Sequence, residues 1–380
     1  MTSVLYLAID LYSIGGIQRY SSAQINVLRE LVGEKSVSVF VLRPQPEGDR
    51  FFELPFEVDY TGKFGKISNR LRFIQETIQY CLHNKPEIIW INHVKLFPLT
   101  FFASTLYKNT FSIGNVYGWE VWSGLSTFEK SAIRRMSHIV SDSHFTANYM
   151  HEAFAIPSDR TTVIWDPVDV DRFVPRQTAA RVLPSYGIPY RSDACYLMTL
   201  GRVSMKSRHK GYDRMLNIMG SIKRKDVIYI IVGDGDDRAR LEKRVVDEGL
   251  SECVYFLGSV PESDLVDVYN AADIFVLVSD RGYGRGEGVP LTPLEAASCG
   301  KPIIVGDEDG SAEAVEHGKN GYIVSPRNLS SITDAILHLV DNPELRQSMG
   351  IAARRRVETH FSYEMFKRRT TVVLDSIVNM

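Results

Sequence analysis

Cysteine and long apolar runs are both scarce in this chain. Its 380 residues include four cysteines that stand far apart and form no C-x-x-C pair, namely Cys81, Cys195, Cys253 and Cys299. This spacing argues against a disulfide framework or a zinc finger and fits a reducing compartment. No run of about 18 or more apolar residues occurs, and no charged leader precedes an apolar segment at the N-terminus. We therefore expect a cytoplasmic protein, attached to a membrane at most peripherally at its inner face.

An excess of charge of one sign is also absent. The chain carries 44 basic and 46 acidic residues, which gives a formal charge of -2, and neither half is a polycation when the chain is divided at Asp166. A nucleic-acid partner is therefore not expected. The chain is 44% apolar and 24% charged and has no low-complexity tract or solenoid repeat, which excludes wholesale disorder and coiled-coil architectures.

Short aliphatic runs alternate with amphipathic stretches along the whole chain, which is typical of βα units around parallel sheets. The predicted strands are 4–11, 37–42, 88–91, 112–117, 138–141, 162–165, 195–200, 227–232, 254–257, 274–278 and 302–305. The predicted helices between them include 17–31, 67–82, 211–219, 237–248, 262–270 and 293–298. After Pro343 the pattern is helical to the end, with a break near 360–363.

A proline-rich segment divides the chain. Residues 166–192 contain four prolines with little periodicity and are interpreted as a domain connector. We expect an α/β fold with a Rossmann-like N-terminal domain at 1–165, a Rossmann-like C-terminal domain at 166–361, and a last helix, 362–380, that returns to the first domain. Open parallel sheets bind ligands at the carboxyl ends of their strands, so the predicted site lies in a cleft between the two domains.

The densest motif is a glycine-rich loop that follows a predicted strand. Four glycines spaced by two lead into Thr292, Pro293 and Glu295, which have the spacing of an N-cap, an N1 proline and a capping-box glutamate. Unpaired amides at such a helix start stabilise an anion such as a diphosphate. On its own, the segment predicts a phosphate site.

Glu287 and Glu295 are separated by seven residues and followed by Ala-Ala-Ser-Cys-Gly-Lys-Pro. This pattern resembles the signature of family 4 retaining glycosyltransferases of GT-B fold. The resemblance implies that Glu287 lies by the transferred sugar, that Glu295 bonds the nucleotide ribose, and that Gly288, Leu291 and Thr292 line the donor site. The simpler alternatives are a solvated loop carboxylate for Glu287 and a helix cap for Glu295.

Further pieces of the same resemblance follow strands of the second half. Arg202 comes after Leu200-Gly201, and Lys210 precedes Gly-Tyr-Asp. The resemblance implies that both cations hold the donor diphosphate, which gains charge as it leaves. Gly233, after another strand, and Val260, whose backbone meets the base in relatives, complete the implied donor site. Solvated surface charges are the alternative for the two cations.

In the first half, Gly15 and Gly16 follow a strand and precede a helix. Gly16 is predicted to let the backbone approach a phosphate or a sugar closely. The loop resembles the N-terminal glycine pair of the family. It lacks the full G-x-G-x-x-G spacing, which argues against a nicotinamide dehydrogenase.

Three residues of the first half are candidate acceptor or sugar contacts. Members of the family often carry a histidine before a glycine where this chain has Tyr117, and a phenol is a poor proton acceptor at neutral pH. Glu120 follows closely, and His93 stands at another strand end. A structural histidine is an equally good interpretation of His93.

Pro290, in place of a glycine, stiffens the donor loop and removes one amide donor.

Neither a metal nor a membrane is required by these motifs. Three D-x-D spellings occur, at 169–171, 234–236 and 307–309, and are interpreted as chance, so we expect no metal. Residues 63–73 interleave four basic residues with apolar ones. A surface helix whose apolar side faces the core is favoured there over a helix on an anionic membrane.

Together, the resemblance implies a retaining glycosyltransferase without a cofactor. It would transfer a hexose, expected to be glucose from UDP-glucose, to a hydroxyl of a saccharide or lipid-linked saccharide acceptor, with Arg202, Lys210 and Glu287 as catalytic residues. The alternatives are a nucleotide-sugar epimerase or a phosphorylase on the same scaffold, because a fold does not fix chemistry. A third alternative is a non-catalytic subunit that binds the donor.

Overall fold

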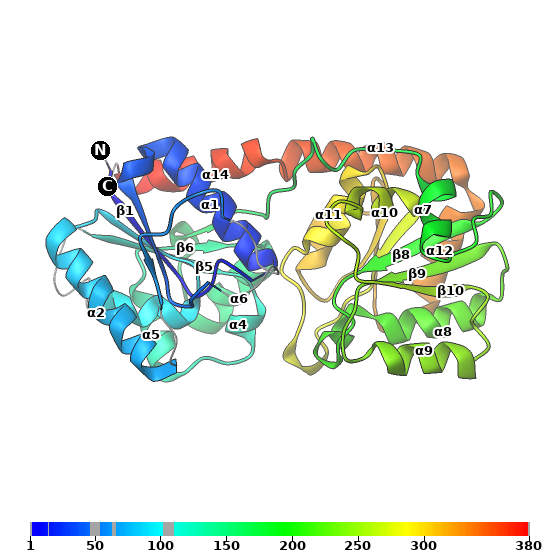
Figure 1. Ribbon diagram of the computed structural model, residues 1–380, viewed down its shortest axis with the longest axis horizontal. Coiled ribbons are helices and arrows are strands. Elements are labelled where there is room, and N and C mark those ends of the chain that lie inside the picture. The colour runs from blue at the N-terminus through cyan, green and yellow to red at the C-terminus, as the bar shows by residue number, and fades with distance from the viewer. Residues whose placement is uncertain (1, 14, 46–53, 63–65, 102–109, 379–380) are drawn as a thin grey trace. The chain divides into compact units, whose positions relative to one another are not determined.

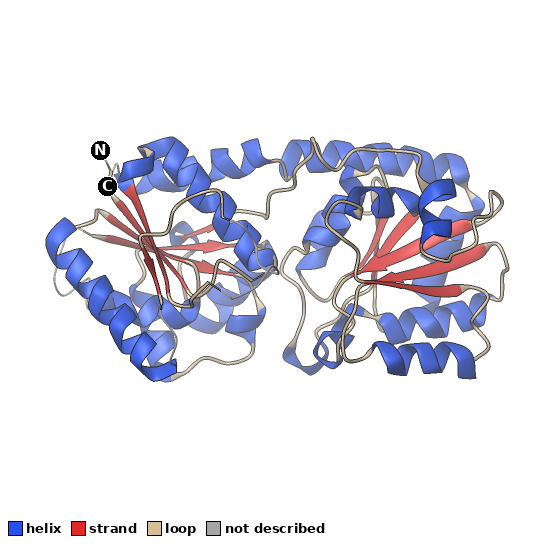
Figure 2. Ribbon diagram, in the orientation of Figure 1, coloured by secondary structure: helices blue, strands red, loops and turns tan. Residues whose placement is uncertain are grey.

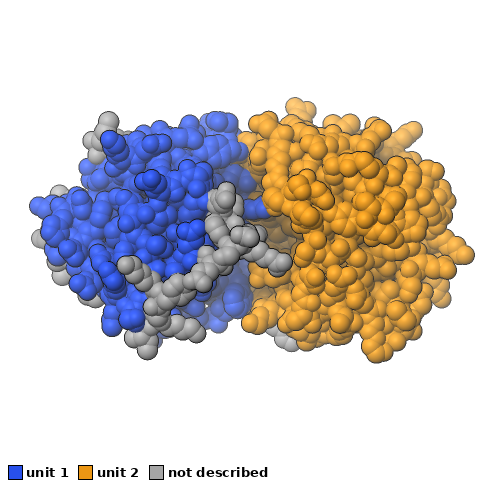
Figure 3. All heavy atoms as spheres, viewed as in Figure 1, with its two compact units in different colours: residues 1–167, 363–380 blue, residues 168–362 orange. Residues whose placement is uncertain are grey.

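The protein consists of two compact units, described here from a computed structural model. The structure describes residues 2–13, 15–45, 54–62, 66–101 and 110–378. Unit 1 comprises Met1–Pro167 with Tyr363–Met380, and unit 2 comprises Val168–Ser362 (Figure 3). In each unit helices flank a central sheet (Figure 2). 

Unit 1 is built on a seven-stranded parallel sheet of order β3-β2-β1-β4-β5-β6-β7. Its strands are β1 (Val4–Ala8), β2 (Val37–Val41), β3 (Tyr60–Thr61), β4 (Ile88–Ile91), β5 (Phe111–Val116), β6 (His138–Ser141) and β7 (Thr161–Val163). Side chains of β1 alternate between two buried clusters: Tyr6 and Ala8 join one, and Leu5 and Leu7 the other. Both faces of the sheet are therefore covered, as the continuous apolar strands require.

The helices of unit 1 include the returning C-terminal helix. In the described ranges they are α1 (Gly16–Val32), α2 (Lys66–Asn84), α4 (Trp119–Trp122), α5 (Thr127–Arg135), α6 (His144–Phe154) and α14 (Tyr363–Val378), with 3-10 turns η1 (Glu34–Ser36), η2 (Val94–Leu99) and η3 (Ser158–Arg160). Helix α14 packs on α1 (Figure 1), where Glu30 accepts hydrogen bonds from the Tyr363 hydroxyl at 2.9 Å and from Lys367 Nζ at 2.7 Å. The end of the chain thus belongs to the unit in which it begins.

Unit 2 has a six-stranded parallel sheet of order β10-β9-β8-β11-β12-β13. Its strands are β8 (Cys195–Leu200), β9 (Val227–Val232), β10 (Val254–Gly258), β11 (Ile274–Leu277), β12 (Ile303–Gly306) and β13 (Gly321–Val324). Its helices are α7 (Ala179–Ser185), α8 (Tyr212–Ile222), α9 (Arg238–Asp247), α10 (Leu265–Ala271), α11 (Leu291–Ser298), α12 (Leu329–Asp341) and α13 (Pro343–His360), with turns η4 (Met205–Lys210), η5 (Gly282–Gly284) and η6 (Gly310–Ala314).

The segment 166–192, interpreted as a domain connector, belongs to unit 2 from Val168 onwards and is not wholly irregular. This segment contains α7, which packs on α10 of unit 2. The carboxylate of Asp267, on α10, accepts a hydrogen bond from the Arg181 guanidinium. The backbone carbonyl of Asp267 accepts from the Thr178 hydroxyl at 2.7 Å. Because these contacts hold the segment on unit 2, the division between the units falls at Pro167 and Val168.

Candidate functional site

The carboxyl ends of the unit 2 strands bring several predicted residues to one edge of the sheet. Gly201 and Arg202 follow β8, and Gly233 follows β9, its immediate neighbour. Gly233 has a φ of 126°, and a Cβ there would lie 2.0 Å from the Gly201 carbonyl oxygen. Only glycine fits this approach, so the chain after β9 passes close to the chain after β8.

Glu287 lies at the centre of this edge. Its Oε1 accepts hydrogen bonds from Lys210 Nζ at 2.6 Å and from His209 Nε2 at 2.8 Å, and all three side chains are largely buried. Burial alone would raise the pKa of Glu287, but the charge of Lys210 and the His209 bond hold that pKa well below its usual range. The carboxylate is therefore ionised at neutral pH, and the interpretation of Glu287 as a solvated loop residue is wrong.

A turn on the other side fixes the backbone of the same loop. The Glu287 amide donates to Asp309 Oδ2 at 2.9 Å, and the Gly310 amide donates to the Glu287 carbonyl at 3.0 Å. Burial, and then the charge of Glu287, raise the pKa of Asp309. A Cβ at Gly310 would lie 2.4 Å from the carbonyl oxygen of Gly288, so this turn packs directly beneath the glycine of the loop. 

Glu295 lies on the buried face of α11, but not as a helix cap. The Tyr269 hydroxyl donates to Glu295 Oε2 at 2.6 Å, and Glu295 is 4% exposed. The predicted capping box is wrong: the helix begins at Leu291 and its N-cap is Pro290, whose extended backbone ends the loop. Thr292 consequently lies within the first turn, where its Oγ1 is buried without a hydrogen-bond partner among the described residues.

Arg202 and Lys210 differ in their surroundings. The Arg202 side chain is exposed and forms no ion pair within the described part of the chain, while its carbonyl accepts from the Tyr212 hydroxyl at 3.4 Å. A Cβ at Gly201 would lie 3.1 Å from Lys210 Cδ, so the lysine stem runs along the end of β8. Val260 is half-buried, two residues after β10. 

His209 is the residue that the sequence motifs missed. Besides its side-chain bond to Glu287, its carbonyl accepts from the Asp280 amide at 2.9 Å and from Arg214 Nη2 at 3.2 Å. Arg214 Nη1 in turn donates to Asp280 Oδ2 at 3.0 Å. The one available signal was its place directly before Lys210 in Arg-His-Lys-Gly.

In unit 1, Gly16 is the first residue of α1, and the preceding Gly15 is extended and contributes no side-chain cap. A Cβ on Gly16 would meet no heavy atom within 4 Å. The packing of the protein therefore does not require glycine at this position.

The three candidate sugar contacts of unit 1 have internal partners. The Tyr117 hydroxyl accepts from Asn115 Nδ2 at 3.0 Å, and burial raises the pKa of Tyr117 well above its ordinary value. Glu120 accepts from the Tyr117 amide. His93 Nδ1 accepts from the Lys95 amide at 3.2 Å, and burial lowers the pKa of His93 to about 4, so this ring is neutral. Contact of these residues with a sugar remains a prediction.

The D-x-D spellings have structural partners. Asp236 Oδ1 accepts from the Met205 amide at 2.8 Å, and Asp309 Oδ1 accepts from the Ser311 amide at 3.0 Å. In the ranges that the structure describes, no group of three or more His, Cys, Asp or Glu residues is placed to hold a metal ion. 

Both halves of the chain match known families. Residues 196–356 match the family described as "Glycosyl transferases group 1", and residues 14–172 match "Glycosyltransferase Family 4". The chain belongs to glycosyltransferase family 4 and has the GT-B fold. This family 4 glycosyltransferase is a hexosyltransferase, so the alternative of a non-catalytic subunit is not favoured.

Relatives of this glycosyltransferase are named as mannosyltransferases. A GDP-mannose-dependent alpha-(1-6)-phosphatidylinositol monomannoside mannosyltransferase of Mycolicibacterium smegmatis is 29% identical over 266 residues, which are 68% of this chain and 67% of the relative. A protein of the same name from Mycobacterium tuberculosis is 26% identical over 370 residues, 92% of each chain. The crystal structure of Anabaena Alr3699/HepE in complex with UDP superposes with a TM-score of 0.80 at 17% identity, covering 99% of this chain and 100% of that one.

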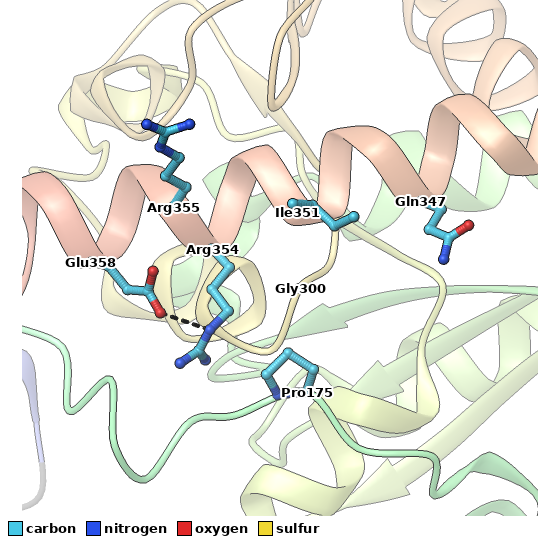
Figure 4. A pocket seen from close by; sticks show the side chains of 7 residues that line it. All are labelled: Pro175, Gly300, Gln347, Ile351, Arg354, Arg355 and Glu358. Carbon is cyan, nitrogen blue, oxygen red and sulfur yellow. Dashed lines mark ion pairs between the residues drawn. The ribbon is translucent and has the colours of Figure 1, made fainter.

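A separate pocket of about 550 Å³ lies in unit 2 of the glycosyltransferase, against α13. Figure 4 shows its lining residues, Pro175, Gly300, Gln347, Ile351, Arg354, Arg355 and Glu358. Arg354 is paired with Glu358 at 2.8 Å and donates to the Ser298 carbonyl at 2.7 Å, so it fastens α13 to the end of α11. None of the predicted site residues lines this pocket.

Proposed function

We propose that this glycosyltransferase transfers a hexose from a nucleoside diphosphate hexose, with retention of configuration, to a hydroxyl of a saccharide or lipid-linked saccharide. The observation that carries the proposal is the convergence of Lys210, His209 and Glu287 beside the exposed Arg202 at the carboxyl edge of the unit 2 sheet. Such a site offers two cations to a diphosphate and one ionised carboxylate to sugar hydroxyls.

Each residue has a role that follows from its chemistry. Arg202 and Lys210 would stabilise the negative charge that grows on the departing diphosphate, together with the free amides at the start of α11. Glu287 would accept a hydrogen bond from a hydroxyl of the transferred sugar. Glu295, held by Tyr269, would accept from the nucleotide ribose. No protein nucleophile and no metal ion is assigned a part in this proposal.

The first donor to test is GDP-mannose. It is the donor in the names of two relatives that are 29% and 26% identical to this chain, whereas UDP-glucose was implied by the general resemblance to the family. A nucleotide that binds only the folded protein raises its melting temperature once its concentration exceeds the dissociation constant. Melting temperatures with GDP-mannose, UDP-glucose, GDP and UDP would therefore rank the two nucleotides.

Turnover of the preferred donor then tests the reaction class. The donor is incubated with and without a saccharide or lipid-linked acceptor, and products are separated by chromatography. We expect acceptor-dependent release of nucleoside diphosphate and an α-linked product from an α-linked donor. Accumulation of an epimeric nucleotide sugar without acceptor would identify an epimerase. Sugar 1-phosphate formed from added phosphate would identify a phosphorylase.

A lipid-linked acceptor would bring the enzyme to a membrane surface, and α2 is the element to test. No helix in the described part of the chain is long and apolar enough to cross a membrane. The apolar side of α2 mostly faces the core, since Phe73 and Cys81 are buried, but Leu71 is 65% exposed between two arginines. The proposed peripheral contact predicts that Leu71→Asp reduces cosedimentation with vesicles containing phosphatidylglycerol, while Val246→Asp, an exposed position on α9, does not.

A further inference from the structure

Only one oxygen of the Glu287 carboxylate accepts hydrogen bonds from described residues. Lys210 Nζ and His209 Nε2 both donate to Oε1. Oε2 has no hydrogen-bond partner among the described residues, and the Glu287 side chain is 17% exposed. Two donors thus fix the rotation of the carboxylate and leave its second oxygen free for a ligand.

The turn that carries His209 is held by hydrogen bonds to the His209 backbone. The side chain of His209 is 10% exposed. Its carbonyl is bonded to the Asp280 amide and to the Arg214 guanidinium, which is itself paired with Asp280. These bonds tie the turn that carries His209 to the start of the loop that carries Glu287. Lys210, in contrast, has a flexible four-carbon stem that can redirect its ammonium group.

Donor binding places conflicting demands on Lys210, and this step rests on the proposed function. If Lys210 turns to the diphosphate, Glu287 loses its cation. A largely buried carboxylate without a partner is costly, and it would rotate or follow the lysine. A second donor on Oε1 reduces that cost without competing for the diphosphate.

We propose that His209 is a positioning residue of the transfer reaction. It keeps Oε1 of Glu287 occupied while Lys210 serves the diphosphate, so that Oε2 stays directed at a hydroxyl of the donor sugar. His209 itself touches neither sugar nor phosphate. The step involves no covalent change, only the exchange of one hydrogen-bond partner of Lys210.

Kinetics of His209→Ala and His209→Gln test this role. The substrate is whichever of GDP-mannose and UDP-glucose the wild type uses, and calorimetry measures the affinity for the matching free GDP or UDP. We expect His209→Ala to lower kcat by roughly 10- to 100-fold, because even a small displacement of a contact at the reacting sugar slows the transfer. Affinity for the free nucleotide should stay within about twofold, since Glu287 does not contact the nucleotide.

The glutamine variant and a control separate positioning from folding. His209→Gln should recover most of the lost kcat, because its side-chain amide can donate to Oε1. His338→Ala removes an exposed histidine of the same unit and should match the wild type. Wild-type kcat in His209→Ala would overturn the inference, and so would equal losses of donor and free-nucleotide binding, or a glutamine variant as slow as the alanine one. These outcomes presuppose an active wild type; no transfer by the wild type would instead overturn the proposed function.

Discussion

The ammonium of Lys210 lies 2.6 Å from Oε1 of Glu287, and the two side chains are 14% and 17% exposed. They are 77 residues apart in the chain and come from the turn before α8 and from the loop before α11. In a buried pair, removal of one partner leaves the other charge uncompensated. A single substitution should therefore lower the free energy of unfolding more than the double substitution does.

Lys210→Ala is expected to lower kcat by on the order of 100-fold or more, because it removes positive charge where the leaving diphosphate gains negative charge. It should also cost on the order of 3 kcal/mol of unfolding free energy, since Glu287 is left buried with less compensation. The double variant Lys210→Ala/Glu287→Gln should regain much of that stability but none of the activity. Steady-state kinetics and urea unfolding measure the two effects.

Lys243→Ala is the matched control for this prediction. Lys243 is 75% exposed and paired with Asp247 on α9. Its loss should change kcat by no more than about twofold and the free energy of unfolding by no more than about 0.5 kcal/mol. Arg202→Ala should lose turnover like Lys210→Ala but keep its stability, because the guanidinium is exposed. Near wild-type turnover in both cation variants would contradict the assignment of the diphosphate to this edge.

Tyr269→Phe tests the role of Glu295. Loss of the hydroxyl removes the 2.6 Å bond to Oε2 and leaves the ring packed against Phe173 and Phe275. We expect the KM for the nucleotide sugar to rise by about 5- to 10-fold, equivalent to roughly 1 kcal/mol, with little change in kcat, because ribose binding is the same in ground and transition states. A fall in kcat at unchanged KM would place Glu295 at the sugar instead of the ribose.

The parts of the fold that the sequence predicted well are those fixed by local pattern. β4, β8 and β9 have the predicted bounds, because a strand buried on both faces is an uninterrupted apolar run. β13 was missed, because two of its four residues are only half-buried and the run is broken by tyrosine and glycine. The 3.6-residue period likewise placed α1 and α9 to within about two residues.

The site was predictable as a set of residues but not as a set of contacts. The family resemblance implied that Lys210 and Glu287 both belong to the donor site, but it did not predict the hydrogen bond that joins them. Glu295 forms no capping box, because α11 begins at Leu291, and it accepts instead from Tyr269, 26 residues earlier. His209 meets Glu287 across 78 residues, and no local rule reports such a contact.

Gly16 and Gly233 make a contrasting pair of glycines. Ala at 233 would place its Cβ 2.0 Å from a backbone oxygen at a φ of 126°, so we expect Gly233→Ala to destabilise unit 2 by several kcal/mol. Gly16→Ala meets open space at a helix start and should keep or slightly raise stability, by about 0.5 kcal/mol.

The activity of Gly16→Ala is therefore informative by itself. If the backbone at Gly16 approaches a phosphate or sugar, kcat/KM should fall by roughly tenfold or more in a variant whose melting temperature is unchanged. Ser22→Ala, a small change at a buried position of the same helix, is the comparison. Full activity in Gly16→Ala would exclude close approach of the ligand at this glycine.

Asp166 is expected to make stability depend on pH. The residue is 6% exposed at the end of unit 1, and burial raises its pKa to about 8 from an ordinary value of 3.8. The folded protein then keeps this proton up to about pH 8, while the unfolded chain releases it above about pH 4. Between these two pH values unfolding releases a proton. The free energy of unfolding should therefore fall by up to about 1.4 kcal/mol per pH unit from pH 4 to pH 8, and level off above pH 8.

Asp166→Asn removes this titration while preserving the shape of the side chain. Urea unfolding of both proteins at pH 5, 6, 7 and 8 measures the effect as a difference, which cancels the titration of all other groups. The variant should gain stability over the wild type progressively as the pH rises, with the largest gap at pH 8. A gap that stays constant over this range would mean that Asp166 is already ionised in the folded protein, and a gap that shrinks would reverse the sign of the argument.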